Sequence, residues 1–341
     1  MFEVLEPGFQ TTVQDVGRQA GQAMGIPPSG AQDTLSLRIA NLLVGNDTGG
    51  PLMVRESPGA AGLEVLLAGL KLRALDTHLI AVTGADVAPD IDGERVPMWE
   101  SVVIRAGQVL SFGIARTGVR AYLAVRGGLD VPMTLGSRAT HMGGGFGGHE
   151  GRKLDAGDRL AVATAPGDPG DLAGRVYAEE MRPVFADPWE VRVIAGPEAH
   201  HFTPDSVETF YATDWKLNPK ADRTGMRFVG PQLAFRPGRP SYLVEEAGQD
   251  PSNIVIDPGA PVGTIQVPSG VEPIVLAVDS PTIGGYARIA CVISTDMSRL
   301  GQTRPWEIVR FVRVEPDEAV RILERENQKI DEDHVRDPLR T

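Results

Sequence analysis

Glycine and proline divide this chain into short segments more strongly than any other feature of its sequence. The 341 residues include 40 Gly and 27 Pro. Short apolar runs separated by such residues are typical of strands joined by tight turns. Runs that contain alternating β-branched or aromatic residues are predicted as strands at 63–67, 78–82, 102–104, 109–112, 121–125, 191–194, 274–278 and 308–314.

Helices are expected to be few. The apolar residues of segment 31–44 recur with helical spacing, which predicts an amphipathic helix. Ser29 followed by Gln32 fits a capping box before this helix, and Gly45 is placed to end it. A shorter helix is predicted to begin at Thr203, because a proline follows in its first turn.

A weak internal echo indicates that the chain contains two related domains. The segment 122–130 is similar to 286–296, and each is followed by a Leu-Gly pair and then a strand-like run. The stretch 164–188 is rich in Ala, Gly, Pro and Asp, which makes it the best linker candidate. A chain of this length is also long enough for two domains. The predicted division is a β-barrel over 1–175, a second β-barrel over 176–316 and a charged helical tail over 317–341.

Charge excludes some classes of function. The formal net charge is −12 and no Lys/Arg cluster is present, which argues against nucleic-acid binding and against an acidic membrane surface. The single cysteine excludes an intrachain disulfide, and no apolar run approaches the ~18 residues of a membrane span. The residues after Met1 read directly as a strand rather than a signal peptide, so a cytoplasmic protein is expected.

Several familiar site motifs fail. The run Gly143–Gly148 satisfies G-x-G-x-x-G, but it lacks the preceding strand and following helix of a dinucleotide site. No P-loop, zinc-protease helix or serine nucleophile elbow is found, and no biotinyl acceptor sequence is seen. The adjacent pair His200-His201 is poorly placed to bind one metal ion. No metal site is therefore expected.

The first polar, glycine-punctuated stretch covers residues 8–33. In loops that lead into the first helix it places Gln14, Asp15, Arg18, Ser29 and Asp33. Backbone N–H groups at that helix start could hold an anionic group. Two simpler explanations stay open: Ser29 caps the helix, and Asp15 and Arg18 form a local ion pair.

Three further polar stretches follow in the second half of the chain. Arg223 and Arg227 could clamp a carboxylate, phosphate or carbamoyl oxygen, although structural salt bridges explain them equally well. Gln266 alternates with apolar neighbours, so its amide is a pocket candidate. The run 279–286 ends an apolar strand beside a Gly-Gly turn and contributes Asp279, Thr282 and Tyr286.

Taken together, these blocks resemble a known family over residues 3–314. The blocks, in order, are Gln14-Asp-x-Gly-Arg18, Gly25-x-Pro-x-Ser-Gly-x-x-Asp33, Asn41–Asn46, Arg120–Gly128, Leu135–Arg138, Gly263–Pro268 and Gly284–Tyr286. The chain is identified by them as similar to the KipA-like C subunits of 5-oxoprolinase and to the carboxyltransferase part of urea carboxylase. This resemblance implies a mainly β fold of two tandem cyclophilin-like β-barrels and a KipI-like B subunit as partner.

The resemblance covers two branches with different reactions. The 5-oxoprolinase branch implies ATP-dependent opening of the 5-oxoproline lactam to glutamate, with a further YcsF-like partner. The urea carboxylase branch implies carboxyl transfer from biotin carried by another protein, with biotin carboxylase and carrier partners. Segments 146–152, 213–216, 223–225 and 250–254 look more like the second branch. The first is the main expectation; a non-catalytic KipI-binding regulator is the third possibility.

Both reactions act on an amide-like group, which is a poor electrophile and a poor nucleophile. Such a site needs cationic donors, a carboxylate for protons and groups that orient the carbonyl. The predicted catalytic residues are Asp15, Arg18, Arg227 and Asp279, with the arginines steadying anionic groups and the carboxylates moving protons. The predicted substrate-binding residues are Gln14, Ser29, Asp33, Arg223, Gln266, Thr282 and Tyr286. ATP is expected to bind on the partner or at a shared site.

Overall fold

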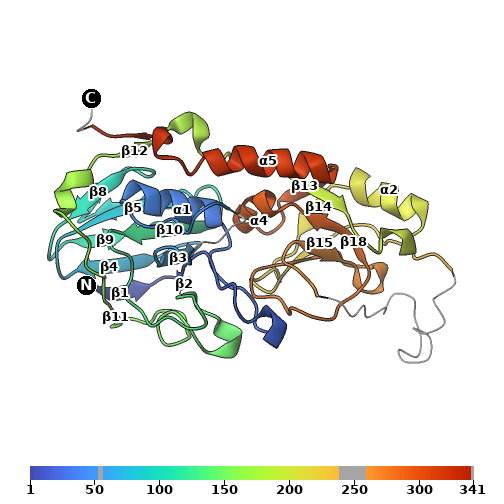
Figure 1. Ribbon diagram of the computed structural model, residues 1–341, viewed down its shortest axis with the longest axis horizontal. Helices are drawn as coiled ribbons and strands as arrows, with labels where there is room; N and C mark the ends of the chain where they lie inside the picture. Colours follow the sequence, from blue (N-terminus) through green and yellow to red (C-terminus); the bar gives the residue numbers. More distant parts are fainter. Residues whose placement is uncertain (53–56, 238–258, 339–341) are drawn as a thin grey trace. The chain divides into compact units, whose positions relative to one another are not determined.

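The computed structural model describes residues 1–52, 57–237 and 259–338. The chain separates into two compact units (Figure 1). The first comprises 1–20, 28–185 and 325–341, and the second comprises 21–27 and 186–324. Compared with the predicted domains, the first unit therefore extends through most of the linker candidate and includes the end of the tail. The segment 250–254 lies outside the described residues.

The mainly β fold expected from the sequence is confirmed, and a strand overlaps each of the eight predicted runs. The first unit contains a six-stranded sheet in the order β11-β1-β4-β9-β6-β7 and a five-stranded sheet in the order β2-β3-β10-β5-β8. Its strands are β1 Phe2–Pro7, β2 Gln10–Gln14, β3 Gly62–Leu66, β4 Leu70–Ala74, β5 His78–Gly84, β6 Asp90–Ile91, β7 Glu94–Arg95, β8 Ser101–Ile104, β9 Val109–Ser111, β10 Arg120–Val125 and β11 Arg159–Leu160. A small pair, β12 Val176–Tyr177 with β20 Val335–Arg336, joins the linker region to the C-terminal segment.

Alternation along the strands gives the five-stranded sheet two different faces. Val13, Leu63 and Leu123 join the residues of the six-stranded sheet in one apolar core. The opposite face carries Leu79 and Ala124, which pack against α1 Thr34–Leu43. Side chains of successive strand residues point to opposite faces, so each strand serves both layers. In the first unit the core thus lies between two sheets, and the helix covers the outer face of one of them (Figure 1).

The first helix corrects the predicted capping box. It begins at Thr34, and its N-cap is Asp33, whose carboxylate accepts a hydrogen bond from Ser36 N at 3.0 Å. An N-cap must lie next to the first helical residue, so Ser29 is too far away to cap this helix. The predicted C-terminal glycine is confirmed, because Gly45 has φ 71° and its N–H donates to Leu42 O.

The second unit contains a closed barrel of seven strands in the order β13-β18-β16-β17-β15-β14-β19. The strands are β13 Trp189–Ala195, β14 Trp215–Leu217, β15 Gly225–Val229, β16 Thr264–Gln266, β17 Ile274–Leu276, β18 Arg288–Val292 and β19 Ile308–Arg313. Among the described residues, the helices assigned to this unit or beginning in it are α2 Pro204–Ala212, α4 Met297–Gln302 and α5 Pro316–Gln328. Closure of the barrel removes the exposed sheet edges that would otherwise remain.

Two predicted helices have different outcomes. Helix α2 has Thr203 as its N-cap and a proline in its first turn, as predicted. The predicted helical tail contains α5, but it is not helical throughout, because α5 ends at Gln328 and the short strand β20 follows. Ile322 is the buried residue of α5, whereas Val320 is 55% exposed. Residues two positions apart point roughly 200° apart around a helix, so both cannot face inward.

Within the three described ranges, no helix combines the length and apolarity needed to cross a bilayer.

Candidate functional site

A row of polar side chains crosses the outer face of the five-stranded sheet. Thr12 is paired in register with Glu64, Glu64 with Tyr122, and Tyr122 with Thr83. All four residues are buried. Because paired residues on neighbouring strands project to the same face, these side chains form one line beneath the start of α1. Buried polar groups in such a line require hydrogen-bond partners.

These side chains form hydrogen bonds to one another and to backbone groups at the start of α1. Glu64 Oε2 accepts hydrogen bonds from Gln32 N at 2.8 Å and from the Tyr122 hydroxyl at 2.7 Å. The Tyr122 oxygen in turn accepts from Asp33 N at 2.8 Å, and Thr83 Oγ1 donates to Ser36 O at 2.7 Å. Burial, together with the Glu64 carboxylate, raises the pKa of Tyr122 well above its usual value. The phenol therefore stays protonated and holds the entry to the helix.

Asp15 anchors a loop immediately after β2. Its Oδ1 accepts from Gly17 N at 2.8 Å and from the Ser137 hydroxyl at 2.7 Å, and its Oδ2 accepts from Arg138 N at 2.5 Å. Burial raises the pKa of Asp15, while these hydrogen bonds oppose the shift. Both oxygens are thus engaged within the first unit. This geometry favours Asp15 as a residue that positions the loop, and its predicted role in proton transfer stays a prediction.

Arg18 is fully buried three residues further on. Its guanidinium donates to Ala139 O at 2.6 Å and lies over the Phe146 ring, 5.0 Å from the ring centroid. The cation is therefore held by a backbone carbonyl and an aromatic face. This arrangement joins the loop after β2 to the glycine-rich run that begins at Gly143.

The segment before α1 runs tightly alongside the loop after β2. Arg18 N donates to Pro28 O, and Ala31 N donates to Asp15 O, both at 2.8 Å. A Cβ at Gly30 would lie 2.6 Å from Gly17 N, and Gly30 has φ 87°. Only glycine satisfies both conditions without strain. Ser29 has φ 52°, an unusual conformation for a non-glycine residue, and such residues cluster at functional sites.

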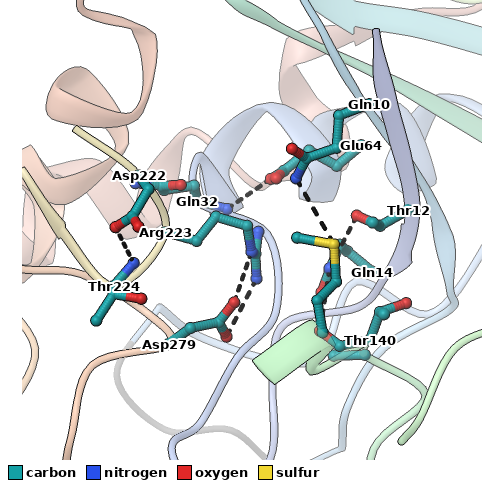
Figure 2. A network of polar contacts seen from close by, with 12 residues as sticks. Gln10, Thr12, Gln14, Gln32, Glu64, Thr140, Asp222, Arg223, Thr224 and Asp279 are labelled. Carbon is teal, nitrogen blue, oxygen red and sulfur yellow. Dashed lines mark hydrogen bonds and ion pairs between the residues drawn. The ribbon is translucent and has the colours of Figure 1, made fainter. Parts of the chain in front are cut away.

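Several buried polar atoms in this region have no hydrogen-bond partner among the described residues. They are Gln14 Oε1, Ser29 Oγ, and both Oε1 and Nε2 of Gln32. The Gln14 amide nitrogen is satisfied, because it donates to Thr12 Oγ1 and Thr140 O (Figure 2). Unpaired buried polar groups are rare in native proteins and costly, and they are typical of positions that bind a ligand or an ordered water.

Asp33 is a predicted substrate-binding residue, and in the structure its carboxylate caps the N-terminus of α1. Besides capping α1, it accepts a hydrogen bond from the Ser36 hydroxyl at 2.6 Å. The first unit thus brings together the predicted residues Gln14, Asp15, Arg18, Ser29 and Asp33. Of these, Gln14 and Ser29 carry open buried polar atoms.

In the second unit, Arg223 and Asp279 form a buried ion pair. Arg223 Nε donates to Asp279 Oδ2 at 2.8 Å (Figure 2). The backbone is paired as well, because Asp279 N donates to Arg223 O at 2.8 Å. The turn that contains Arg223 is fixed by Asp222, which accepts hydrogen bonds from Thr224 N and Gly225 N. A predicted catalytic residue and a predicted binding residue are thus partners, as expected of a salt bridge that shapes a loop.

The remaining predicted residues of the second unit lie in separate places. Arg227 is 42% exposed and contacts Glu272 at 3.0 Å. Gln266 and Tyr286 line a small pocket, where Gln266 Oε1 accepts from Tyr286 N at 3.3 Å. Thr282 Oγ1 instead donates to Gln22 O at 3.1 Å. The structure brings Gln266 and Tyr286 together, whereas Arg227 is paired elsewhere.

A larger cavity of about 480 Å³ lies along the glycine-rich run in the first unit. Phe146 and His149 line it together with Asp130 and Arg159. The His149 Nε2 atom lies 3.3 Å from Asp158 Oδ1. The run itself forms a short 3₁₀ turn, Met142–Gly144, followed by turns rather than a helix. No group of three potential metal ligands was found in the part of the chain that the structure describes.

Sequence reasoning missed Glu64 and Tyr122 and considered Gln32 only as a helix cap. One signal was available, because Glu64 lies between apolar residues in a predicted strand. A charged residue within such a run marks either a solvent-facing position or a buried, paired group. Only the paired strands show that the second applies.

Residues 24–313 match the model of the family described as carboxyltransferase domain, subdomain A and B, and the chain belongs to that family.

Among similar curated proteins, the 5-oxoprolinase C subunit of Escherichia coli (strain K12) is 34% identical over 323 residues, which is 94% of each chain. Urea amidolyase of Lachancea kluyveri is 32% identical over 97% of this chain, but over 18% of its own length. The crystal structure of the K. lactis urea amidolyase matches 98% of this chain and 20% of that chain, with a TM-score of 0.86 and 31% identity. The chain is thus similar to both branches.

Proposed function

We propose that this chain is the counterpart of the 5-oxoprolinase C subunit in a heteromeric, ATP-dependent enzyme that opens a lactam. The observation that carries the proposal is the 34% identity to that subunit of the Escherichia coli enzyme, which extends over 94% of both chains. Partners would include a KipI-like B subunit and a further YcsF-like protein. ATP would bind at a site shared with, or located on, a partner.

The chemistry of the first unit supports an amide-like substrate. Opening a lactam with ATP transfers a phosphoryl group to the carbonyl oxygen and releases ADP. Water then attacks the carbon, and the C–N bond breaks as the nitrogen takes up a proton. The resulting acyl phosphate is hydrolysed by a second water to the carboxylate and phosphate. The open atoms of Gln14, Ser29 and Gln32 are neutral donors and acceptors, which orient an uncharged amide. Arg18 and Asp15 lie beside them and set the position of the surrounding loops.

The second unit has its own charged candidates. Arg227 is the more accessible cation, whereas Arg223 is held by Asp279. We assign to Arg227 the stabilisation of an anionic group and to Asp279 a role in proton transfer. If Asp279→Asn and Arg227→Ala variants that remain folded and partner-bound keep full activity, these assignments fail.

A second candidate function is carboxyl transfer from biotin on another protein to urea or a related amide. The family match and the similarity to the K. lactis urea amidolyase structure favour it. The same neutral donors and acceptors would then orient urea, and an arginine would hold the carboxyl group being transferred.

The deciding experiment measures ADP release by the chain reconstituted with its KipI-like partner and any third component. Stimulation by 5-oxoproline, with glutamate as product, would support lactam opening. No response to 5-oxoproline, together with a biotin-dependent signal from urea and bicarbonate, would replace it with carboxyl transfer. No response to either substrate, but tight binding of the KipI-like protein, would favour a regulatory role.

A further inference from the structure

Gln32 is the most unusual polar residue of the first unit. Its side chain is 2% exposed, yet neither its carbonyl oxygen nor its amide nitrogen has a partner among the described residues. Its backbone is well held, because Gln32 N donates to Glu64 Oε2 at 2.8 Å (Figure 2). Native proteins rarely bury a whole carboxamide without satisfying either end.

The surrounding structure prevents this carboxamide from escaping to solvent through a shift of its backbone. On one side, Ala31 N is bound to Asp15 O, and on the other, Asp33 N is bound to the Tyr122 hydroxyl. The next residue begins α1, which is anchored by Thr83. Three consecutive backbone N–H groups are therefore fixed. The Gln32 side chain is thus attached to a rigid backbone, as is typical of preorganised recognition groups.

The chemistry of the two open atoms limits what can pair with them. An anion offers only acceptors and would leave Gln32 Oε1 unpaired. A cation offers only donors and would leave Nε2 unpaired. A ligand that satisfies both atoms must present a donor and an acceptor on one edge. A planar amide with its N–H and C=O on the same side, as in a lactam or urea, has this arrangement.

We infer that Gln32 recognises the N–H/C=O edge of the substrate amide through two parallel hydrogen bonds. This inference rests on the proposed function and extends it, because it names the Gln32 carboxamide as the group that recognises the substrate amide. Gln14 and Ser29 are the neighbouring contributors. Gln14 donates to Thr12, the register partner of Glu64, and Ser29 lies three residues before Gln32. Each supplies a further open oxygen.

The test compares two small lactams on the full chain bound to its KipI-like partner. The probes are 2-pyrrolidinone and N-methyl-2-pyrrolidinone, which differ by the N–H that Gln32 Oε1 would accept. Binding is followed by titration calorimetry and by the ¹⁵N-labelled side-chain amide signal of Gln32. Wild type should bind 2-pyrrolidinone roughly 10- to 100-fold more tightly than the N-methyl compound, the range expected for leaving a buried polar group unpaired. The Gln32 signal should shift with the first probe.

The variant Gln32→Met keeps the length of the side chain and removes both polar atoms. It should lose most of this discrimination, whereas Gln10→Met, a matched change on β2, should retain it. Gln10 has a 3.9 Å contact to Met142 Sδ and lies outside the buried row. If wild type does not discriminate, or if Gln32→Met discriminates as wild type does, the inference is overturned. An amide signal that responds to neither probe would mean that Gln32 holds only ordered water, which also overturns it.

These outcomes are separable from the fate of the proposed function. Discrimination at Gln32 without 5-oxoproline-dependent ADP release would keep the inference and remove lactam opening. In that case, urea competing with 2-pyrrolidinone would identify the urea branch as the source of the amide. Conversely, 5-oxoproline-dependent ADP release with an unchanged KM in Gln32→Met would keep the function and overturn the inference.

Discussion

At the scale of single residues, the protein retains polar groups that weaken its own fold. An unpaired buried carboxamide costs stability, because its hydrogen bonds to water in the unfolded chain are not replaced on folding. Among the described residues, Gln32 has two such atoms, and Gln14 and Ser29 have one each. Retaining this cost is consistent with a binding role, since stability is often sacrificed where function needs open groups.

We expect Gln32→Met to stabilise the chain without ligand by about 1–2 kcal/mol, because it replaces an unpaired buried amide with an apolar group of similar size. Guanidinium chloride unfolding followed by circular dichroism measures the effect, because urea is itself a candidate ligand of this site. The control Gln10→Met should stay within about 0.5 kcal/mol of wild type, as is usual for a position outside the core. Destabilisation by Gln32→Met would show that the amide is satisfied in the free protein.

At the scale of elements, two segments hold the polar face in place. The 28–31 segment before α1 packs against the loop after β2, and the glycine-rich run packs near Arg18. Both depend on contacts that are tight and specific. Each can be disturbed by one substitution for which the chain offers a matched control.

Gly30→Ala should destabilise the first unit by about 2 kcal/mol or more. The added Cβ would lie 2.6 Å from Gly17 N, and φ is 87°. Gly93→Ala is the matched control, because Gly93 has φ 86° but nothing within 4 Å of the added atom. The difference between the two free energies of unfolding isolates the contact from the backbone strain. Equal losses in the two variants would contradict the close approach seen at Gly30.

Just after the glycine-rich run, Arg152 and Asp155 bind the carboxylate of Asp158. Two nitrogens of Arg152 donate to its carboxylate at 2.8 and 2.9 Å, and Asp155 N donates to it at 2.8 Å. Chiefly through its hydrogen bonds, Arg152 lowers the pKa of Asp158 to about 2. The carboxylate therefore favours the folded state at neutral pH.

This pKa shift predicts a pH dependence. A carboxyl group whose pKa is lowered by folding contributes stability that is complete above its unfolded pKa of about 4 and is lost as pH falls through about 2. Solvent screening limits the contribution to about 1 kcal/mol. The free energy of unfolding, measured in urea, should therefore change less between these pH values for Asp158→Asn than for the control Asp130→Asn. Asp130 is exposed, so its replacement leaves the Asp158 pair in place. Parallel curves would contradict the role of the pair.

At the scale of the whole molecule, the C-terminal segment completes the first unit. Tyr177 donates from its hydroxyl to Lys329 O at 2.8 Å, and β12 pairs with β20. Arg175 forms an ion pair with Glu332 and also donates to Leu42 O at 3.0 Å, at the end of α1. The C-terminal segment thus stabilises the end of α1, and the start of the same helix covers the polar row of the sheet.

Truncation after Gln328 should increase amide hydrogen exchange in β12 and in the last turn of α1, by roughly tenfold or more, because their anchoring contacts are lost. Peptides from the barrel strands of the second unit serve as an internal reference and should not change. Glu332→Gln removes only the ion pair and should have a smaller effect. A uniform increase across both units would contradict the assignment of the C-terminal segment to the first unit.

The local pattern of the sequence determined the elements of this protein well. Alternation and glycine or proline punctuation located strands such as β5 and β19, and Gly45 and Thr203 marked helix ends correctly. Such signals are local, because backbone geometry and side-chain direction are fixed within a few residues. The order of the motif blocks also pointed to the family to which the chain belongs.

Tertiary structure alone decided which polar residues meet. Glu64 and Tyr122 are 58 residues apart and become neighbours only through strand register, and Arg223 and Asp279 become partners across 56 residues. The open carboxamide of Gln32 likewise exists only because Glu64 and Tyr122 fix the backbone beside it and α1 covers the sheet. Register, burial and hydrogen-bond satisfaction are properties of packed surfaces, so no local sequence pattern specifies them.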